Sequence, residues 1–172
     1  MHSQLAAARS GDESAFVDML APLLQEAHRL AFAMLQNQHD AEDAVQEASF
    51  HAWRAVGRLR EGSNTRPWFL TIVANECRQR RRGRWWNVIK GQPLPEVASP
   101  GPEEGLAASD LRRALARLNP DMRLVVVLRY YLDLPFADMG RVLGITPAAA
   151  KLRTHRALRR LRLEVPEDLS DE

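Results

Sequence analysis

Hydrophobic residues recur every three or four positions along most of this chain, which is the period of an α-helix. The clearest example begins at Asn119-Pro120, where a capping side chain precedes a proline whose backbone dihedral suits a first helical turn. The apolar run that follows is interrupted at Leu134-Pro135. The pattern therefore predicts a helix that starts at residue 120 and ends before residue 134.

Two further helices are predicted after this interruption, with a tight turn between them. Apolar positions over residues 136–143 predict a short helix, and Gly144 provides the left-handed residue that a sharp turn between helices needs. Thr146 is then expected to cap a third helix with Pro147 at its first position. Two helices joined in this way are typical of a helix-turn-helix that binds DNA.

The predicted third helix has two different faces. At about 100° per residue, Ala150, Thr154, Ala157 and Leu161 share one side and are expected to face the core. The other face joins small residues near the helix start to cations further along, an arrangement that suits base edges and phosphates. A solvated basic helix is the alternative, but the preceding turn favours DNA. The candidate DNA-binding residues are Thr146, Ala148, Lys151, Leu152, Arg153, His155, Arg156 and Arg159.

The N-terminal part is also predicted to be helical. A helix pair is expected over residues 3–36, with Ser14 as a cap and a bend near Pro22, and Asp40 is expected to cap a helix over residues 40–56. The buried stripe of that helix is Ala41, Ala44, Val45, Ala48, Ala52 and Val56, so its acidic residues and Phe50 lie outside it. This outer face is a solvated surface, a docking face for a basic partner, or a metal site built from His39, Asp43, Glu47 and His51.

A polar loop over residues 57–65 precedes a helix predicted to start at Pro67. Phe69, Ile72, Val73 and Cys77 mark its core side, so Cys77 is interpreted as a core residue, with a redox sensor as the alternative. The other side carries Thr71, Asn75, Arg78 and Arg82, and Trp85-Trp86 follows. Cations beside tryptophans suit melted nucleic acid, although the tryptophans could also close the core.

Residues 91–105 are rich in proline and glycine and predict a linker, after which Ser109-Asp110 is expected to begin another helix. We therefore predict an all-α chain with two small helical domains, residues 1–90 and 106–165, joined by this linker and followed by an acidic tail over residues 166–172. The formal net charge is +2, yet residues 78–90 and 151–162 are basic without any acid, as expected of phosphate-binding surfaces.

Other classes of protein are disfavoured by what the sequence lacks. No apolar run approaches the length of a membrane span, and no secretory signal is recognised, so a cytoplasmic location is expected. The sequence also offers no nucleophile with its base, no glycine loop for phosphate and no metal quartet. We therefore expect a protein without catalytic activity, cofactor or bound metal.

Three stretches in fixed order carry a close resemblance to the extracytoplasmic-function (ECF) sigma factors, a branch of the sigma-70 family of bacterial RNA polymerase. They are DAEDAVQEASFHAWRAV (40–56), RPWFLTIVANECRQRRR (66–82) and the stretch over residues 118–162, which contains the predicted helix-turn-helix. The resemblance implies an N-terminal region 2 domain that binds core polymerase and opens the minus-ten element. It also implies a C-terminal region 4 domain that reads the minus-thirty-five element.

Site residues follow from the resemblance position by position. The clamp of the polymerase largest subunit would be contacted by Asp40, Glu42, Asp43, Gln46 and Glu47, and the flap of the second subunit is a further implied partner. In the N-terminal domain, the resemblance together with the polar helix side assigns DNA contact to Ser63, Asn64, Thr65, Thr71, Asn75, Arg78, Arg81 and Arg82. An anti-sigma factor is a further implied partner.

Two departures from the family pattern affect these assignments. The loop that captures a base has Asn64 and Thr65 where the family often has an aromatic residue, and Leu152 places an apolar side chain on the outward face of the recognition helix. We predict that Leu152 contacts a thymine methyl group or the promoter backbone. The principal alternative function is an autonomous helix-turn-helix repressor or activator whose N-terminal half senses a ligand or dimerises. An enzyme with a DNA-binding appendage is a third alternative.

Overall fold

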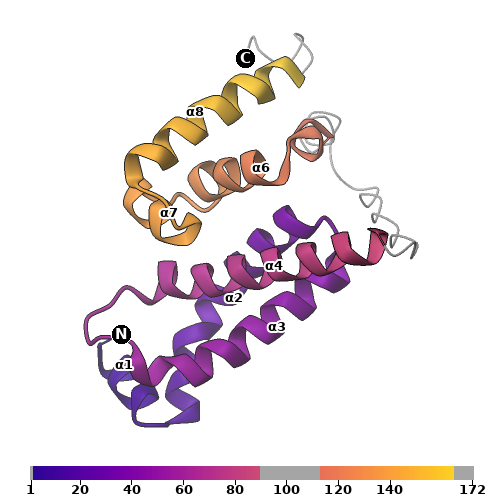
Figure 1. The fold of residues 1–172 in the computed structure, drawn as a ribbon. Coiled ribbons are helices and arrows are strands. Elements are labelled where there is room, and N and C mark those ends of the chain that lie inside the picture. The colour runs from indigo at the N-terminus through magenta and orange to yellow at the C-terminus, as the bar shows by residue number, and fades with distance from the viewer. Residues whose placement is uncertain (1, 90–112, 165–172) are drawn as a thin grey trace, which may run out of the picture. The chain divides into compact units, whose positions relative to one another are not determined.

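A computed structural model describes residues 2–89 and 113–164 of the chain. Contacts divide the chain into two compact units, Met1–Pro95 and Glu96–Glu172. Every regular element within the described residues is helical (Figure 1), which confirms the predicted all-α class. No helix within this part of the chain is long and apolar enough to cross a membrane.

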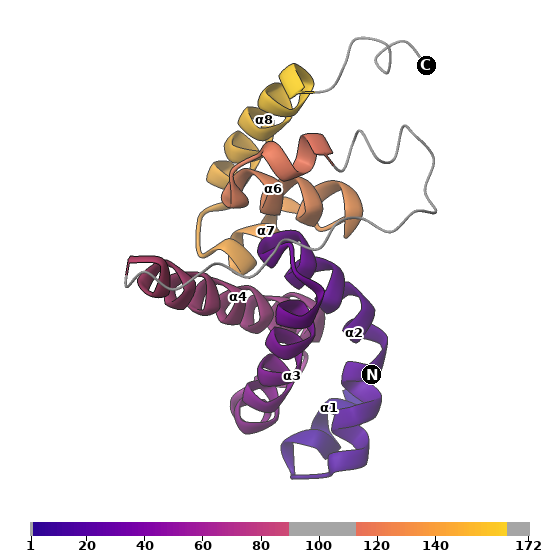
Figure 2. The same ribbon diagram turned by 90° about the vertical axis from the view of Figure 1, so that its right-hand side faces the viewer.

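The described residues of the N-terminal unit form four α-helices, of which the three longest pack against one another. The elements are α1 (His2–Arg9), α2 (Glu13–Leu35), α3 (Gln38–Ala55), the 3₁₀ turn η1 (Val56–Arg58) and α4 (Thr65–Ile89). Helices α2, α3 and α4 each contact the other two, as the two ribbon views show (Figures 1 and 2). The predicted stripe of small residues on α3 is buried throughout, which lets the neighbouring helices approach closely.

Three predicted helix starts in this unit are wrong by a few residues. Helix α2 is capped by Asp12, whose Oδ1 accepts a hydrogen bond from the Ala15 amide at 3.1 Å, so Ser14 is already helical. Helix α3 is capped by Asn37 and not by Asp40, because Asn37 Oδ1 accepts from the Asp40 amide at 2.9 Å.

Helix α4 begins at Thr65, two residues before the predicted start at Pro67. The Asn64 side-chain oxygen accepts a hydrogen bond from the Arg66 amide at 3.1 Å, as an N-cap residue does. Helix α2 is assigned as one element through Pro22.

The C-terminal unit has the predicted order of elements. Residues 113–117 are helical, and α6 (Pro120–Val126), the π-helical turn η2 (Val127–Tyr131), α7 (Phe136–Leu143) and α8 (Pro147–Glu164) follow. Asn119 caps α6 by accepting from the Met122 amide at 2.8 Å. Gly144 ends α7 in the left-handed region with φ 67°. Both assignments confirm the predictions made from the sequence.

A buried arginine, which the sequence analysis missed, closes the start of this unit. Arg123 lies on α6 within the apolar run and is 6% exposed. Its Nε donates to the Leu115 carbonyl at 2.8 Å, and its Nη2 donates to the Ala116 and Leu118 carbonyls at 2.9 and 3.0 Å. These carbonyls lie at the end of the helix at residues 113–117 and just after it, where the regular backbone hydrogen bonds of a helix are no longer made. Arg123 therefore ties that helix to α6.

Replacing Arg123 by methionine is expected to lower the free energy of unfolding of the C-terminal unit by about 2–4 kcal/mol. Methionine fills similar volume but leaves three carbonyl oxygens without their charged donor. Amide hydrogen exchange, followed separately for the two units, measures this loss. Arg159→Met, on an exposed position of α8, is the control and should change stability by no more than about 0.5 kcal/mol. Equal stability of the two variants would contradict the role of Arg123.

Some predictions lie outside the described residues. They concern the linker over residues 91–105, the helix start at Ser109-Asp110 and the tail over residues 166–172. The side chains of Trp85 and Trp86 are likewise outside the described part.

Candidate nucleic-acid and protein interfaces

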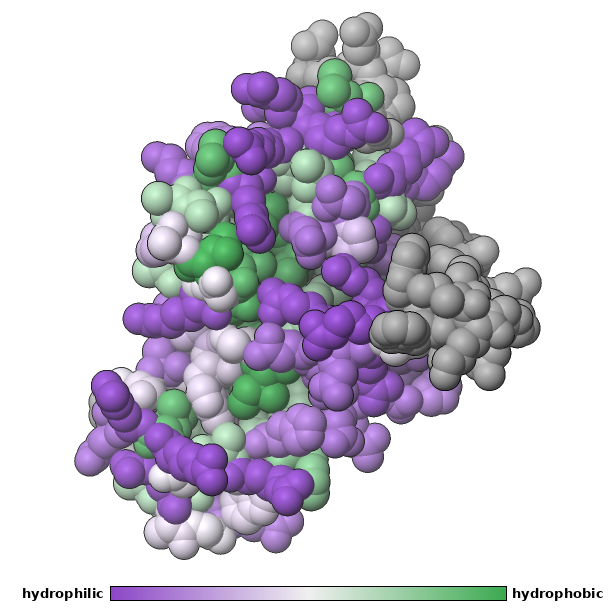
Figure 3. All heavy atoms as spheres, in the orientation of Figure 1, coloured by the Kyte–Doolittle hydropathy of each residue, from purple (hydrophilic) through white to green (hydrophobic). Residues whose placement is uncertain are grey.

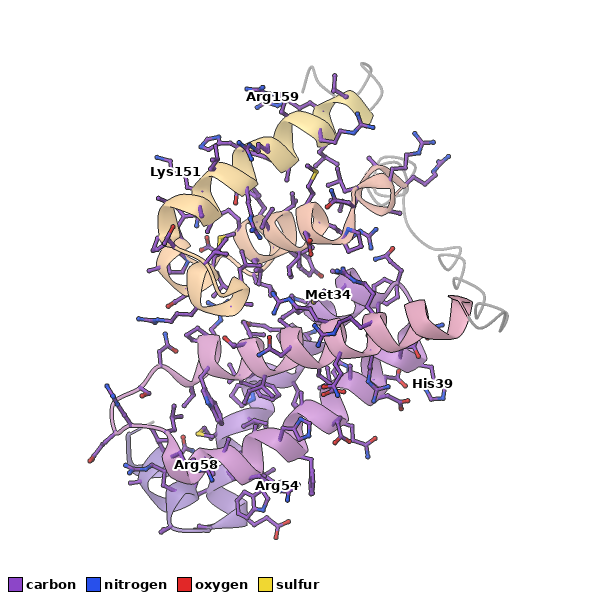
Figure 4. All side chains as sticks on the ribbon, viewed as in Figure 1. Met34, His39, Arg54, Arg58, Lys151 and Arg159 are labelled. Atoms are coloured by element: carbon purple, nitrogen blue, oxygen red, sulfur yellow. The ribbon has the colours of Figure 1, made fainter. Side chains whose placement is uncertain are left out.

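Helix α8 presents the predicted face to solvent. Ala150, Thr154 and Ala157 are buried and Leu161 is half-buried, as expected for its core side. Lys151 and Arg159 project from the side of α8 that faces away from α6 (Figure 4). The surface over α8 is largely hydrophilic, with hydrophobic side chains between the polar ones (Figure 3). All eight candidate residues are exposed: Thr146, Ala148, Lys151, Leu152, Arg153, His155, Arg156 and Arg159.

The position of α8 depends on the turn that precedes it. Thr146 Oγ1 accepts a hydrogen bond from the Ala149 amide at 3.2 Å, which confirms Thr146 as the cap. The Ile145 amide donates to the Gly140 carbonyl at 3.0 Å. A Cβ atom on Gly140 would lie 2.7 Å from the Ile145 carbonyl oxygen, so this turn packs against α7 with no space for a side chain. The sequence analysis identified Gly144 but missed Gly140.

Leu152 is the apolar exception on this face. Its side chain is 51% exposed, although a leucine gains free energy by leaving water. It lies among cations on the outward side of α8, where a base edge or sugar of bound DNA could cover it.

Helix α4 carries the predicted polar row. Asn75 and Arg82 are exposed, whereas Arg78 and Arg81 are half-buried. The Thr71 hydroxyl donates to the Pro67 carbonyl at 2.6 Å, and Arg78 Nη1 donates to Asn75 Oδ1 at 2.8 Å. The latter contact joins an amide and a cation on one side of α4, where they could act together on a base and its phosphate.

The loop before α4 is held at its end by an ion pair. Arg66 Nε lies 2.8 Å from Glu26 Oε2 on α2, which ties the start of α4 to the rest of the unit. Asn64 is exposed and Ser63 is half-buried. Thr65 is only 6% exposed, so the expectation that its side chain meets DNA is corrected. Its place in the first turn of α4 turns it toward the core, which leaves Ser63 and Asn64 as the accessible loop residues.

The acidic side of α3 remains at the surface. Glu42, Gln46 and Glu47 are exposed, while Asp40 and Asp43 are half-buried. Together these five residues form what we name the docking face. A groove beside it, of about 560 Å³, is lined by Asp43, Gln46, Glu47, Phe50 and Arg80.

Phe50 and Arg80 line this groove in addition to the predicted contact residues. Phe50 was placed on the outer face of the helix from the sequence but was not assigned a partner contact, and Arg80 was predicted only as part of the basic stretch 78–90. Phe50 is 54% exposed, and the Arg54 guanidinium carbon lies 5.4 Å from the centre of its ring. Arg80 Nη1 reaches across from α4 to Asp43 Oδ2 at 3.5 Å. An exposed aromatic ring within an acidic surface is typical of a site that binds a cationic side chain.

The histidines of α3 pair with carboxylates. His39 Nδ1 lies 3.5 Å from Asp43, and His51 Nε2 lies 3.3 Å from Glu47. Among the described residues, no group of three or more His, Cys, Asp or Glu side chains is arranged to hold a metal ion.

Cys77 is buried in the N-terminal unit, as predicted from its apolar surroundings. Burial, together with the nearby Glu76 carboxylate, raises the pKa of the Cys77 thiol to about 12. The thiolate is the reactive form of cysteine. This environment therefore supports a core role and not a redox role.

Comparison with known proteins gives a consistent result over both units. The family model described as Sigma-70 region 2 matches residues 19–87, and the model described as Sigma-70, region 4 matches residues 108–161. The first match contains α3, the following loop and most of α4, and the second contains α6, α7 and most of α8.

Individual relatives cover nearly the whole chain. The RNA polymerase sigma factor CarQ of Myxococcus xanthus is 32% identical over 158 residues, which span 90% of this chain and 91% of CarQ. The ECF RNA polymerase sigma factor SigM of Mycobacterium tuberculosis is also 32% identical, over 91% of this chain and 80% of SigM.

A similar solved structure is that of the sigma factor RpoE in complex with the anti-sigma factor NepR from Bartonella quintana. It matches with a TM-score of 0.73 and 28% identity, over 87% of this chain and 95% of that chain.

Proposed function

The chain belongs to the ECF group of the sigma-70 family, and from this premise we propose how its surfaces direct promoter-specific transcription initiation. The docking face on α3 binds the clamp of core RNA polymerase. The loop at Ser63 and Asn64, with the polar side of α4, opens the minus-ten element, and α8 reads the minus-thirty-five element. The sigma function is thereby divided between two helical units, residues 1–90 and 106–165.

The observation that carries this proposal is the exposed face of α8. Eight residues chosen for DNA contact are all exposed, while Ala150 and Ala157 on the other side are fully buried. The first turns of such a helix enter the major groove, and cations further along reach phosphates. The cap and the tight turn before the helix also hold these side chains at fixed positions relative to the rest of the unit. Recognition of a DNA sequence requires such fixed positions.

Polymerase binding is supported by the charge and exposure of the docking face. Glu42, Gln46 and Glu47 are exposed on a helix whose opposite side is buried against the rest of the unit. A basic helix of the partner would meet carboxylates at the rim and the exposed ring of Phe50 beside them. Interfaces of this kind gain specificity and association rate from complementary charge and affinity from the aromatic anchor.

Promoter opening is supported by the arrangement before and along α4. The Asn64 oxygen caps the helix, so its amide nitrogen remains to donate to an unstacked base. Asn75 and Arg82 are exposed on the helix that follows. A hydrogen bond to an unstacked base contributes about 0.5–1.5 kcal/mol, so several such contacts together offset the few kcal/mol that unstacking one base costs.

Permanganate reactivity of thymines near the minus-ten element, in the presence of core polymerase and this chain, tests promoter opening. Asn64→Ser should reduce the reactive fraction about twofold to tenfold, because serine keeps the cap but loses the amide donor. Gln25→Ala, at an exposed position on α2, is the control and should open promoters normally. Normal opening by Asn64→Ser would show that Asn64 does not capture a base.

Leu152→Ala is expected to lower discrimination at one base pair of the minus-thirty-five element by about threefold to tenfold. This is less than a bidentate hydrogen-bond pair provides, because an apolar contact with a thymine methyl group is weaker. Selection from a randomised promoter library by the holoenzyme measures the change. Leu163→Ala serves as the control, since Leu163 is exposed on the same helix outside the proposed set. Unchanged preference with Leu152→Ala would contradict the contact.

The remaining features follow from this function. Initiation by core polymerase requires promoter recognition and no chemistry from the sigma subunit, so we propose that the chain has no catalytic activity of its own. Core polymerase and the chromosome are its partners, so we place it in the cytoplasm. An anti-sigma protein that covers the docking face or α8 would hold the chain inactive, and the complex of RpoE with NepR provides a precedent.

A further inference from the structure

Two histidines flank two carboxylates along one side of α3. His39, Asp43, Glu47 and His51 are spaced four residues apart, so they lie in one row along the helix. His39 Nδ1 is 3.5 Å from Asp43 Oδ1, and His51 Nε2 is 3.3 Å from Glu47 Oε1. Both carboxylates belong to the docking face. Each of them therefore has a titratable neighbour that is not part of the predicted polymerase contact.

Helix α4 adds charged groups to this row. Glu76 Oε2 lies 3.6 Å from His51 Nδ1, so His51 stands between two carboxylates. Arg80 lies 3.4 Å from Glu76 and 3.5 Å from Asp43. His39 also lies in the field of Asp40 and Glu42 on its own helix. Arg80 is charged at every pH near neutrality and partly neutralises the negative charge of Asp43. The histidines neutralise carboxylate charge in the row only when they are protonated.

The two histidines are accessible to solvent protons. His39 projects from the N-terminal end of α3 (Figure 4), and its side chain is 84% exposed. The side chain of His51 is 46% exposed. A backbone hydrogen bond and then the Asp43 carboxylate raise the pKa of His39 above its usual value.

We propose that the docking face is a pH-sensitive surface, on which protonation of His39 and His51 weakens binding to core RNA polymerase. The inference rests on the proposed function of the docking face. A protonated histidine forms an ion pair with a carboxylate that a basic side chain of the partner would otherwise bind. The partner must therefore break this ion pair when it docks. Protonated histidines therefore favour the free chain, and neutral histidines favour the complex.

The sign of the pH dependence follows from linkage. Docking brings basic side chains against Asp43 and Glu47 and thereby favours loss of a proton from each neighbouring histidine. Binding that releases protons becomes stronger as pH rises and weaker as pH falls. Because each exposed ion pair has a modest effect, two such pairs predict about tenfold weaker docking at pH 6 than at pH 8.

The test is the affinity of the full chain for core polymerase between pH 6 and pH 8. Three proteins are compared: the wild type, the double variant His39→Gln with His51→Gln, and the control His28→Gln, whose histidine lies on α2 outside the row. Glutamine can still hydrogen-bond to a carboxylate but cannot become charged. The wild type and the control should lose about ten times more affinity over this range than the double variant, whose profile lacks the contribution of His39 and His51.

The possible outcomes distinguish failure of the pH-sensitivity proposal from failure of the proposed docking function. Parallel pH profiles for the wild type and the double variant, with binding intact, would overturn the inference while leaving the docking face in place. If the wild type does not bind core polymerase at any pH, the proposed function fails and the inference fails with it. Thermal unfolding of the three proteins at each pH shows whether a difference in affinity arises from folding.

Discussion

Replacing both Glu42 and Glu47 by lysine is expected to weaken binding to core polymerase by about 100-fold or more, with normal folding of the chain. Both side chains are exposed on α3, so the change does not bury a charge. It converts attraction to a basic partner into repulsion at two points, and close charge pairs across interfaces couple by several kcal/mol. Fluorescence anisotropy with labelled chain and core polymerase measures the loss.

A matched control keeps the change in net charge constant. Glu13→Lys with Asp18→Lys alters the same number of charges at exposed positions of α2, away from the docking face. This variant should bind within about threefold of the wild type, the size of a long-range charge effect at physiological salt. Equal losses in the two double variants would mean that net charge, and not the docking face, determines affinity.

The second large effect is expected from Gly140→Ala, which should destabilise the C-terminal unit by about 3 kcal/mol. The added Cβ would lie 2.7 Å from the Ile145 carbonyl oxygen and 3.4 Å from the Pro147 nitrogen. Both are backbone atoms of the turn before α8, so relief requires α7 and α8 to move apart. The measured quantities are amide hydrogen exchange of the C-terminal unit and minus-thirty-five discrimination by the holoenzyme.

Two other glycines provide the controls. Gly144→Ala meets no atom within 4 Å, but its φ of +67° is strained for alanine, so a loss of about 1 kcal/mol is expected. Gly83→Ala on α4 also meets no atom within 4 Å and has no positive φ, so it should be neutral or slightly stabilising. A Gly140→Ala variant as stable as Gly83→Ala would contradict the close approach described for the turn.

The helix-turn-helix could be predicted from the sequence because its determinants are local. A proline, a left-handed glycine and a capping threonine act within a few residues of their own positions, and Gly144 and Thr146 adopt the predicted roles. Helix starts in the N-terminal unit were harder to predict. Several capping residues stand close together there, and Asp12 and Asn37 act as caps in place of the predicted Ser14 and Asp40.

Residues that depend on contacts between distant segments could not be identified in the same way. Arg123 is buried only because the end of another helix supplies three carbonyl acceptors for it. Arg80 belongs to a cationic run, yet it reaches Asp43 on α3 because it lies on the side of α4 that faces that helix. Gly140 is required by a turn five residues away. These roles follow from packing, which periodicity does not specify.

The same distinction applies to the candidate interfaces. Exposure of the α8 face and of Glu42, Gln46 and Glu47 was predicted from helical periodicity alone. Thr65 was assigned to DNA contact from the family resemblance of the loop before α4, although the earlier start of α4 buries it. Phe50 was seen to lie outside the buried stripe, but its position in a groove with Arg80 required the contact between α3 and α4.

Run-off transcription with core RNA polymerase over a library of randomised promoters tests the central claim most directly. We expect transcripts from a defined class of promoters, sharing a minus-ten and a minus-thirty-five element, only when this chain is added to the core enzyme. Transcription that is unchanged by the chain, or that starts without preference for any promoter sequence, would contradict it.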